Sequence, residues 1–299
     1  MIYLDEAQVR SLLRWEELIP AMEQALAQFS LGNVVQPVRS VLTVEEGRRY
    51  FGVMPVAAQD VMGVKAVSFY PANERGPAPT HQAIVLLFRT DNGEPLAVMD
   101  GRLITEMRTA AVSAAITKYL MPAQSRVLAL LGSGVQADSH LAALSSIHQF
   151  DEVRVWSRTP EHAAEFARRR GAVAMEAEAA VRGADVIVVA TSSQEPVLRG
   201  AWLKEGAHVN AIGANRPAWR ELDDDAMHHV LVVDSRAAVL QESGDVILSG
   251  ATIYAEIGEI FAGTKPACAA ETTIFKSVGL ATEDLAAARL VYAAHTATN

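Results

Sequence analysis

The sequence has a single cysteine, fewer basic than acidic residues and no long apolar run. Cys268 cannot form a disulfide within the chain, so the fold must rest on hydrophobic cores. No apolar run approaches the roughly 18 to 20 residues that cross a bilayer, and the first residues lack the basic and apolar regions of a signal peptide. These absences predict a cytoplasmic protein without a membrane-inserted segment.

The charge balance and the histidines argue against two further classes of protein. The chain carries 26 basic and 35 acidic residues, a formal net charge of −9, which is the wrong sign for a general binder of phosphate backbones. His228 and His229 are adjacent, lack the spacing of metal ligands and have no accompanying cysteine or carboxylate pattern. We therefore expect no nucleic-acid partner and no metal site.

The length of 299 residues predicts two domains, because one hydrophobic core seldom serves so long a chain. Apolar residues at helical spacing predict one helix over 9–29. From residue 34 to 99 short β-like runs predict a small antiparallel sheet, with a tight hairpin at Asn92-Gly93. The runs that we expect to form its strands are 41–44, 50–54, 63–69 and 83–89.

An alanine-rich segment, 103–120, predicts a long buried helix that crosses from one domain to the other. After it, continuous apolar strands alternate with helices, which indicates a parallel sheet covered on both faces. Strands are expected at 126–131, 152–156, 186–190, 208–212 and 230–234, and helices at 136–146 and 160–170. The predicted fold class is α/β, with a doubly wound Rossmann domain over 119–275. A second, α+β domain is expected from both chain ends, 1–118 plus 276–299, with a last helix near 282–294.

A glycine-rich turn follows the first of these parallel strands and opens a helix. Gly132 permits a tight turn, Gly134 lets the backbone approach a pyrophosphate, and Ala137 lets helix and strand pack closely. The N-terminus of the helix then faces the phosphates. In this context we interpret the whole run as a dinucleotide site, although the glycines alone would also fit a structural turn. The run is Gly132-Ser133-Gly134-Val135-Gln136-Ala137.

The end of the second strand bears on which dinucleotide is bound. An NAD enzyme places an acid there to hold the ribose 2′-hydroxyl, but this chain has Ser157-Arg158-Thr159. A guanidinium and two hydroxyls suit a 2′-phosphate, so the sequence predicts NADP(H); the alternative is that Arg158 is a solvated charge. Further candidates for the cofactor or nicotinamide pocket stand where later strands end: Thr191, Ser192, Ile212 and Gly213.

Three cations lie in the otherwise apolar segments of the N-terminal half. Arg39 and Lys65 belong to β-like runs, and Arg108 stands near the start of the alanine-rich helix. Burying such a cation is costly unless it meets an anion, and the carboxylate of a substrate would serve. The alternative for each is a structural cation that is salt-bridged or whose charged end reaches water.

These motifs together resemble the ornithine cyclodeaminase/mu-crystallin family over nearly the whole chain, and its ketimine reductase branch in particular. The runs that carry the resemblance are Gln36-Pro37-Val38-Arg39, Gly52-Val53-Met54-Pro55, His81-Gln82-Ala83, Ala97-Val98-Met99-Asp100-Gly101, Arg108-Thr109-Ala110-Ala111, the glycine-rich turn, Arg216-Pro217-Ala218-Trp219-Arg220-Glu221-Leu222-Asp223-Asp224 and Glu242-Ser243-Gly244-Asp245-Val246. The resemblance implies an NAD(P)-binding Rossmann domain and a domain from both chain ends that binds substrate and forms a homodimer by pairing sheets.

The resemblance also implies roles for single residues. Arg39, Lys65 and Arg108 match positions around an amino-acid carboxylate and its reacting nitrogen, and Thr109 falls in the same motif as a cofactor-binding candidate. His81 becomes a candidate for lining the substrate pocket, although a lone histidine is more often structural. These assignments come from the resemblance and not from the spacing of the residues.

One departure from the family pattern separates its branches. Cyclodeaminases of this family carry an aspartate in a glycine-glycine-aspartate run, and the matching run here is Gly213-Ala214-Asn215. An amide cannot take or give a proton at neutral pH, so Asn215 remains a substrate-binding candidate and cannot be the acid/base of deamination. This favours reduction, with Lys65 or Glu242 supplying or relaying the proton. Glu242 is equally compatible with a helix-capping or surface role.

The predicted function is therefore the NADPH-dependent reduction of cyclic ketimines to cyclic amino acids. The family implies Δ1-pyrroline-2-carboxylate or Δ1-piperideine-2-carboxylate as substrate, giving L-proline or L-pipecolate. Two alternatives stay open: an ornithine cyclodeaminase or other amino-acid dehydrogenase of the family, and a crystallin-like protein that binds NADPH or a ligand without catalysis.

Overall fold

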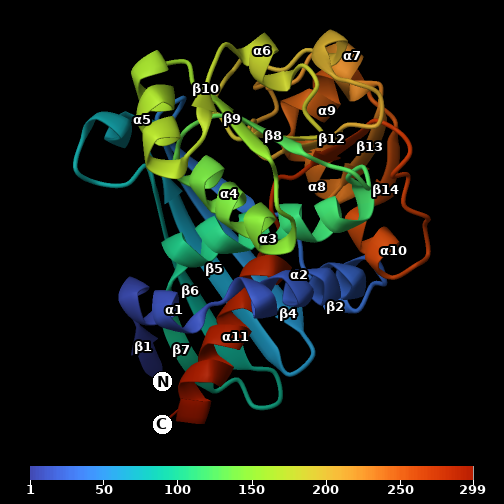
Figure 1. Ribbon diagram of the computed structural model, residues 1–299. Helices are drawn as coiled ribbons and strands as arrows, with labels where there is room; N and C mark the ends of the chain where they lie inside the picture. Colours follow the sequence, from blue (N-terminus) through green and yellow to red (C-terminus); the bar gives the residue numbers. More distant parts are fainter. Residues whose placement is uncertain (299) are drawn as a thin grey trace. The chain divides into compact units, whose positions relative to one another are not determined.

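The computed structural model describes residues 1–298 and divides the chain into two compact units. We call Met1–Arg108 with Leu280–Asn299 the terminal unit, and Thr109–Gly279 the central unit. Figure 1 shows the helices and strands, many of them labelled, numbered in chain order. Each unit has its own sheet, so each is described by itself.

The terminal unit is built on a seven-stranded sheet within the described residues, and it is antiparallel except at one edge. The strands are β1 (Ile2–Leu4), β2 (Val34–Val35), β3 (Ser40–Glu45), β4 (Arg49–Ala58), β5 (Val61–Phe69), β6 (His81–Arg89) and β7 (Pro95–Asp100). They follow the order β1-β7-β6-β5-β4-β2, with β3 also paired to β4 and β1 parallel to β7. The predicted hairpin is confirmed between β6 and β7, where Gly93 has a φ of 76°.

Helices α1 (Glu6–Leu12), α2 (Trp15–Ser30) and α11 (Ala281–Thr298) complete this unit, together with a short 3-10 helix, η1 (Pro71–Arg75). Helix α11, drawn in red in Figure 1, contacts α2 and strands β4, β5 and β6. The prediction of one helix over 9–29 is wrong, because the backbone of Leu13 is extended, with a ψ of 120°. A capping box at Asp5 fixes where α1 begins.

Helix α3 (Gly101–Leu120) confirms the predicted alanine-rich helix, and the boundary between the units falls within it. A Cβ at Gly101 would lie 2.9 Å from the carbonyl carbon of Ala83, so only glycine allows the helix to begin this close to β6. Ala110 and Ala114 are fully buried. Small side chains therefore let the central part of α3 pack closely against its surroundings.

The central unit confirms the predicted Rossmann-type parallel sheet. Its strands follow the order β10-β9-β8-β11-β12-β15-β13-β14 and every pairing is parallel. The strands are β8 (Val127–Leu131), β9 (Glu152–Trp156), β10 (Val173–Ala174), β11 (Val186–Val189), β12 (His208–Ala211), β13 (Val230–Val233), β14 (Ile253–Glu256) and β15 (Thr273–Lys276). The helices are α4 (Val135–Ile147), α5 (Pro160–Arg170), α6 (Ala177–Val181), α7 (Asp224–Met227), α8 (Arg236–Glu242), α9 (Gly244–Ser249) and α10 (Ile257–Phe261), with the 3-10 helix η2 (Gly200–Trp202).

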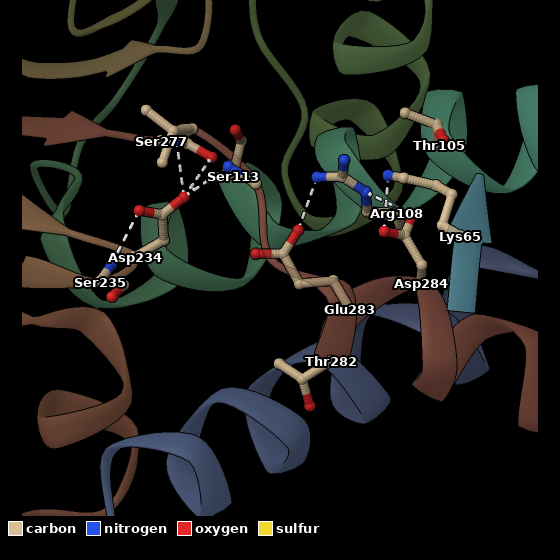
Figure 2. A network of polar contacts seen from close by, with 12 residues as sticks. Lys65, Thr105, Arg108, Ser113, Asp234, Ser235, Ser277, Thr282, Glu283 and Asp284 are labelled. Atoms are coloured by element: carbon tan, nitrogen blue, oxygen red, sulfur yellow. Dashed lines mark hydrogen bonds and ion pairs between the residues drawn. The ribbon is translucent and has the colours of Figure 1, made fainter. Parts of the chain in front are cut away.

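A buried carboxylate fixes the segment that follows β15. Asp234, directly after β13, accepts hydrogen bonds from the backbone N–H groups of Val278 and Gly279, each at 2.7 Å, and from the Ser277 hydroxyl at 3.0 Å. Figure 2 shows this carboxylate with Ser277 and Ser235 around it. The segment is therefore held by side-chain as well as backbone contacts, as buried polar groups require.

Among residues 1–298, none of the helices is both long and apolar enough to cross a membrane.

Candidate functional site

Four charged side chains meet in the interior of the terminal unit, and we call Lys65, Arg108, Glu283 and Asp284 the ionic cluster (Figure 2). Lys65 Nζ lies 2.6 Å from Asp284 Oδ2. Arg108 Nη1 donates to Glu283 Oε2 at 2.6 Å, and Arg108 Nε donates to Asp284 Oδ1 at 3.1 Å. Each residue is at most 4% exposed, so all four charges are held out of water.

Three elements bring the ionic cluster together. Lys65 projects from β5, Arg108 from α3, and the two acids from the first turn of α11. Acids in a first turn interact favourably with the positive end of the helix dipole. The backbone N–H of Thr282, one residue earlier, donates to Gln36 Oε1 at 2.7 Å and so anchors that turn. Two cations face two anions, which offsets much of the cost of burying them.

The burial of Lys65 and Arg108 is thus explained without a substrate, because the chain supplies the anions itself. Neither Glu283 nor Asp284 was predicted from the sequence as a site residue. Their signal is a pair of adjacent acids at the start of an otherwise apolar helix, a pattern that equally fits a solvated first turn.

The cluster shifts the proton affinities of its members. Burial lowers the pKa of Lys65 from 10.5 to about 8, while Asp284 opposes the shift and Arg108 and Arg39 add to it. Burial alone would raise the pKa of Asp284, but Lys65 and Arg108 hold it below its ordinary value. Lys65 can therefore release a proton near neutral pH while Asp284 stays ionised.

Two other predicted substrate residues belong to the same unit. Burial lowers the pKa of His81, the first residue of β6, to about 4, and the positive charges of Lys65 and Arg108 lower it further. His81 is therefore neutral at pH 7 and can line a site as a hydrogen-bonding group without charge. Arg39, which is partly buried just before β3, contributes its positive charge to the field at Lys65.

The glycine-rich turn of the central unit has the geometry of a pyrophosphate cradle. Gly132 has a φ of 120°, and a Cβ there would lie 2.4 Å from the carbonyl oxygen of Ala190. Gly134 caps the N-terminus of α4, and a Cβ there would meet nothing within 4 Å, so its backbone faces open space. Ala137 is fully buried. The residues present fit a dinucleotide, because close approach to the backbone and a helix N-terminus are what its phosphates need.

The remaining cofactor candidates stand at the same edge of the sheet. Ser157, Arg158 and Thr159 follow β9, and the turn at Gly132 is joined to that strand by a hydrogen bond of 2.9 Å to the carbonyl of Trp156. Arg158 is exposed, and Thr159 is the residue that precedes the first turn of α5. No carboxylate stands in this short connection, as the printed sequence shows.

The loops after β11 and β12 are in direct contact. A Cβ at Gly213 would lie 2.3 Å from the carbonyl oxygen of Thr191, so the two loops could not approach this closely with a larger residue at that position. Ile212 is joined to β11 by a hydrogen bond of 3.0 Å from its N–H to the carbonyl of Val189. Ser192 is exposed beside Thr191. The predicted candidates Thr191, Ser192, Ile212 and Gly213 thus lie on two loops that touch each other.

The positions of the remaining predicted residues are as follows in the structure. Thr109 is nearly buried in α3. Asn215 is exposed on the loop after β12, next to Ala214, which has a φ of 50°. Glu242 is the last residue of α8 and is partly buried. Ser133, in the turn before α4, is partly buried. Val135 and Gln136 are the first two residues of α4, and the former is exposed whereas the latter is partly buried. Among residues 1–298 no group of three His, Cys, Asp or Glu side chains could hold a metal ion.

Comparison with known proteins gives a consistent family. The model of the ornithine cyclodeaminase/mu-crystallin family matches residues 2–299. The ketimine reductase mu-crystallin of Rattus norvegicus is 52% identical over 300 residues, covering 97% of this chain and 96% of the relative.

Two solved structures are similar over the whole chain. One is the Δ1-pyrroline-2-carboxylate reductase of Thermococcus litoralis in complex with NADH and L-proline, with a TM-score of 0.94 and 35% identity, covering 100% of this chain and 98% of that one. The other is an archaeal alanine dehydrogenase dimer with bound NAD, with a TM-score of 0.93 and 33% identity, covering 99% and 96%. The chain belongs to the ornithine cyclodeaminase/mu-crystallin family.

Proposed function

We propose that this protein reduces cyclic ketimines with NADPH, taking Δ1-pyrroline-2-carboxylate or Δ1-piperideine-2-carboxylate to L-proline or L-pipecolate. The observation that carries the proposal is Lys65, a buried lysine whose pKa is lowered to about 8 within a charge-balanced cluster. At the coarser level of reaction class, the prediction of an oxidoreductase that acts on a C=N bond is confirmed by the relatives. A nicotinamide cofactor is likewise supported by the dinucleotides bound in similar structures.

Lys65 is the proton donor in this proposal. When bound, the cofactor supplies a hydride to the imine carbon. The imine nitrogen must carry a proton for that carbon to be electrophilic, and the Lys65 ammonium can supply or retain it. The C=N bond then becomes a C–N single bond, with one hydride on carbon and one proton on nitrogen. Asp284 keeps the Lys65 ammonium in place through its contact at 2.6 Å. Glu242 remains the second candidate for relaying the proton.

Arg108 and Arg39 hold the substrate carboxylate in this proposal. A guanidinium has five N–H donors, and the contacts of Arg108 with Glu283 and Asp284 use only two of its nitrogens, Nη1 and Nε. The two internal carboxylates fix the plane of the guanidinium, which reduces the ordering that binding requires. His81 would line the substrate pocket as a neutral group. The terminal unit is then the substrate-binding and dimerisation domain, and the central unit the cofactor domain.

The choice of reaction is tested by a substrate panel. We expect NADPH absorbance to fall with the five- or six-membered cyclic ketimine, and we expect no ammonia from ornithine, because Asn215 cannot act as an acid/base. Ammonia release with cyclisation of ornithine would establish the cyclodeaminase alternative. Tight NADPH binding without turnover of any imine would establish the non-enzymatic one. The cytoplasmic location stays a prediction from the sequence.

The pH dependence of catalysis should follow Lys65. Because the donor must be protonated, kcat/KM for the imine is expected to fall as the pH rises through about 8, the pKa of Lys65. Asp284→Asn removes the charge that opposes the lowering of this pKa, so the fall should begin at lower pH, by about one unit.

The control for this pH profile is Asp91→Asn, which removes an exposed acid of the same unit. Its profile should coincide with that of the wild type. A profile of Asp284→Asn that moves to higher pH would contradict the assignment of Lys65 as the donor.

The exposed apolar side chains of β3 predict a homodimer. Val41, Leu42 and Val44 are 41%, 64% and 54% exposed on this strand, and a flat apolar strand of this kind is usually covered by another chain. Light scattering at micromolar concentration should report a dimer. Leu42→Lys should weaken it, whereas Thr43→Lys, on the opposite face of the strand, should act less. A wild-type monomer with full activity would refute the dimer.

A further inference from the structure

A second buried ionic group, which the reaction proposed above does not use, lies in the central unit. Glu221, Asp245 and Lys276 are each 0% exposed, and we call them the inner triad. Lys276 Nζ lies 2.8 Å from Asp245 Oδ2 and also donates to the carbonyl oxygen of Gly213. Asp245 Oδ1 accepts from the backbone N–H groups of Glu221 and Leu222 at 2.8 and 3.0 Å.

The inner triad contacts both loops that carry the nicotinamide-pocket candidates. Glu221 Oε1 accepts from the backbone N–H of Thr191 at 2.7 Å and from its hydroxyl at 2.6 Å. A Cβ at Gly213 would lie 2.5 Å from each carboxyl oxygen of Glu221, so the carboxyl group packs directly against that backbone. Glu221 therefore fixes the loop after β11 and the loop after β12 at the same time.

The charges of the inner triad do not balance. Two carboxylates face one ammonium, and an uncompensated charge without exposure to water is strongly disfavoured. The imbalance is removed when one carboxyl group holds a proton. Asp245 forms the ion pair with Lys276 and accepts two backbone hydrogen bonds.

Glu221 is the better site for the proton. Its Oε2 atom is buried and has no hydrogen-bond partner among the described residues. Burial, reinforced by the charge of Asp245, raises the pKa of Glu221 to about 7, although Lys276 and Thr191 act against the rise. The charged groups that face Glu221 are Lys276 on β15 and Asp245 on α9. Because the pKa of Glu221 lies near neutral pH, the net charge of the triad changes by one unit in that range.

We propose that Glu221 is a positioning residue that holds the nicotinamide end of the cofactor site and, by gaining or losing its proton, changes the relative affinity for oxidised and reduced cofactor. The inference rests on the proposed function, in which Thr191 and Gly213 line the nicotinamide pocket. The oxidised nicotinamide ring is a cation and the reduced ring is neutral. An ionised Glu221 close to the ring therefore favours NADP⁺, and a protonated Glu221 favours NADPH relative to it.

The test measures the dissociation constants of NADP⁺ and NADPH for the full-length protein between pH 6 and pH 8.5 by titration calorimetry or fluorescence. The ratio of the two constants, NADP⁺ over NADPH, should fall by about threefold to tenfold as the pH rises. The 2′-phosphate titrates in both cofactors, so its effect largely cancels in the ratio. Glu221→Gln, which keeps an oxygen acceptor for Thr191, should give a ratio that does not change with pH.

Three further variants make the outcome decisive. Glu195→Gln removes an exposed acid from the loop after β11 and should behave as the wild type. Lys65→Met removes another group whose pKa lies in this range, and the fall should persist in it. Thr191→Val removes a donor to the ionised carboxylate, so the fall should move to higher pH, and this variant still tests the inference if Glu221→Gln does not fold.

The possible results distinguish a failure of the inference on Glu221 from a failure of the proposed function. A ratio that is flat in the wild type, or a fall that persists in Glu221→Gln, overturns the inference while the proposed function stands. A protein that binds neither NADPH nor NADP⁺ overturns the proposed cofactor use and this inference with it.

Discussion

Replacing Arg108 by alanine is expected to lower kcat/KM for the imine by about a hundredfold or more, because the substrate carboxylate loses a charge-assisted partner. The same change leaves Glu283 and Asp284 buried without their shared cation. Removing one partner of a buried ion pair costs about 3–5 kcal/mol, so the free energy of unfolding should fall by that order. Steady-state kinetics and urea unfolding followed by circular dichroism measure the two effects.

The two consequences of losing Arg108 can be separated. Arg108→Lys keeps the positive charge but not the planar donor set, so it should recover part of the stability and little of the activity. Arg102→Ala, nearer the start of α3, removes a partly exposed arginine that pairs with Glu6 and Glu106, and should cost less than about 1 kcal/mol with unchanged kinetics. NADPH affinity should stay near that of the wild type in all three. An Arg108→Ala protein of wild-type efficiency would remove Arg108 from the substrate site.

The sequence predicted the central unit well because its signals are local. Strands β8 and β11 are continuous apolar runs, and parallel strands buried on both faces have that pattern. The role of each small residue in the glycine-rich turn could be predicted, because a positive φ and a close approach of the backbone each require a small residue. Strands β10, β14 and β15 were not predicted, because β10 has only two residues and because β14 and β15 each end in a charged residue that interrupts the apolar run.

The buried charged groups were predicted less well, because their partners lie far away in the sequence. Lys65 and Arg108 stood out as cations in apolar segments, but their partners Glu283 and Asp284 lie about 175 residues further along the chain from Arg108. A substrate carboxylate was therefore the expected anion, whereas the structure supplies two internal ones. Lys276 and Glu221 were not singled out as buried charges, since a single charged residue is normally at the surface.

The break between α1 and α2 illustrates the same limit at the level of secondary structure. Apolar residues continue at helical spacing through the break, because α1 and α2 both bury a face, with Val9 on one and Leu18 on the other. Periodicity reports the buried face and not the continuity of the backbone. The capping box at Asp5 is present in the sequence, but it marks only where α1 begins.

Replacing Arg158 by alanine is expected to weaken NADPH binding about thirtyfold, the equivalent of about 2 kcal/mol, and to leave NADH binding nearly unchanged. Arg158 is exposed at the carboxyl end of β9, where its guanidinium can reach a 2′-phosphate and no carboxylate of the same connection repels one. The wild type should accordingly prefer NADPH to NADH. Titration of both cofactors by fluorescence or calorimetry measures the two constants.

Two variants define the source of that preference. Arg168→Ala removes another exposed arginine, on α5, and should leave the ratio of the two affinities unchanged, because only a specific contact distinguishes the cofactors. Ser157→Asp places an acid where the ribose 2′-hydroxyl of NADH could donate a hydrogen bond to it and where a 2′-phosphate would be repelled, so it should move the preference toward NADH. Equal binding of both cofactors by the wild type would contradict the preference for NADPH, and so would an equal loss of affinity for both in Arg158→Ala. Either result would make Arg158 a general surface charge, and the site would then accept NAD(H) as well as NADP(H).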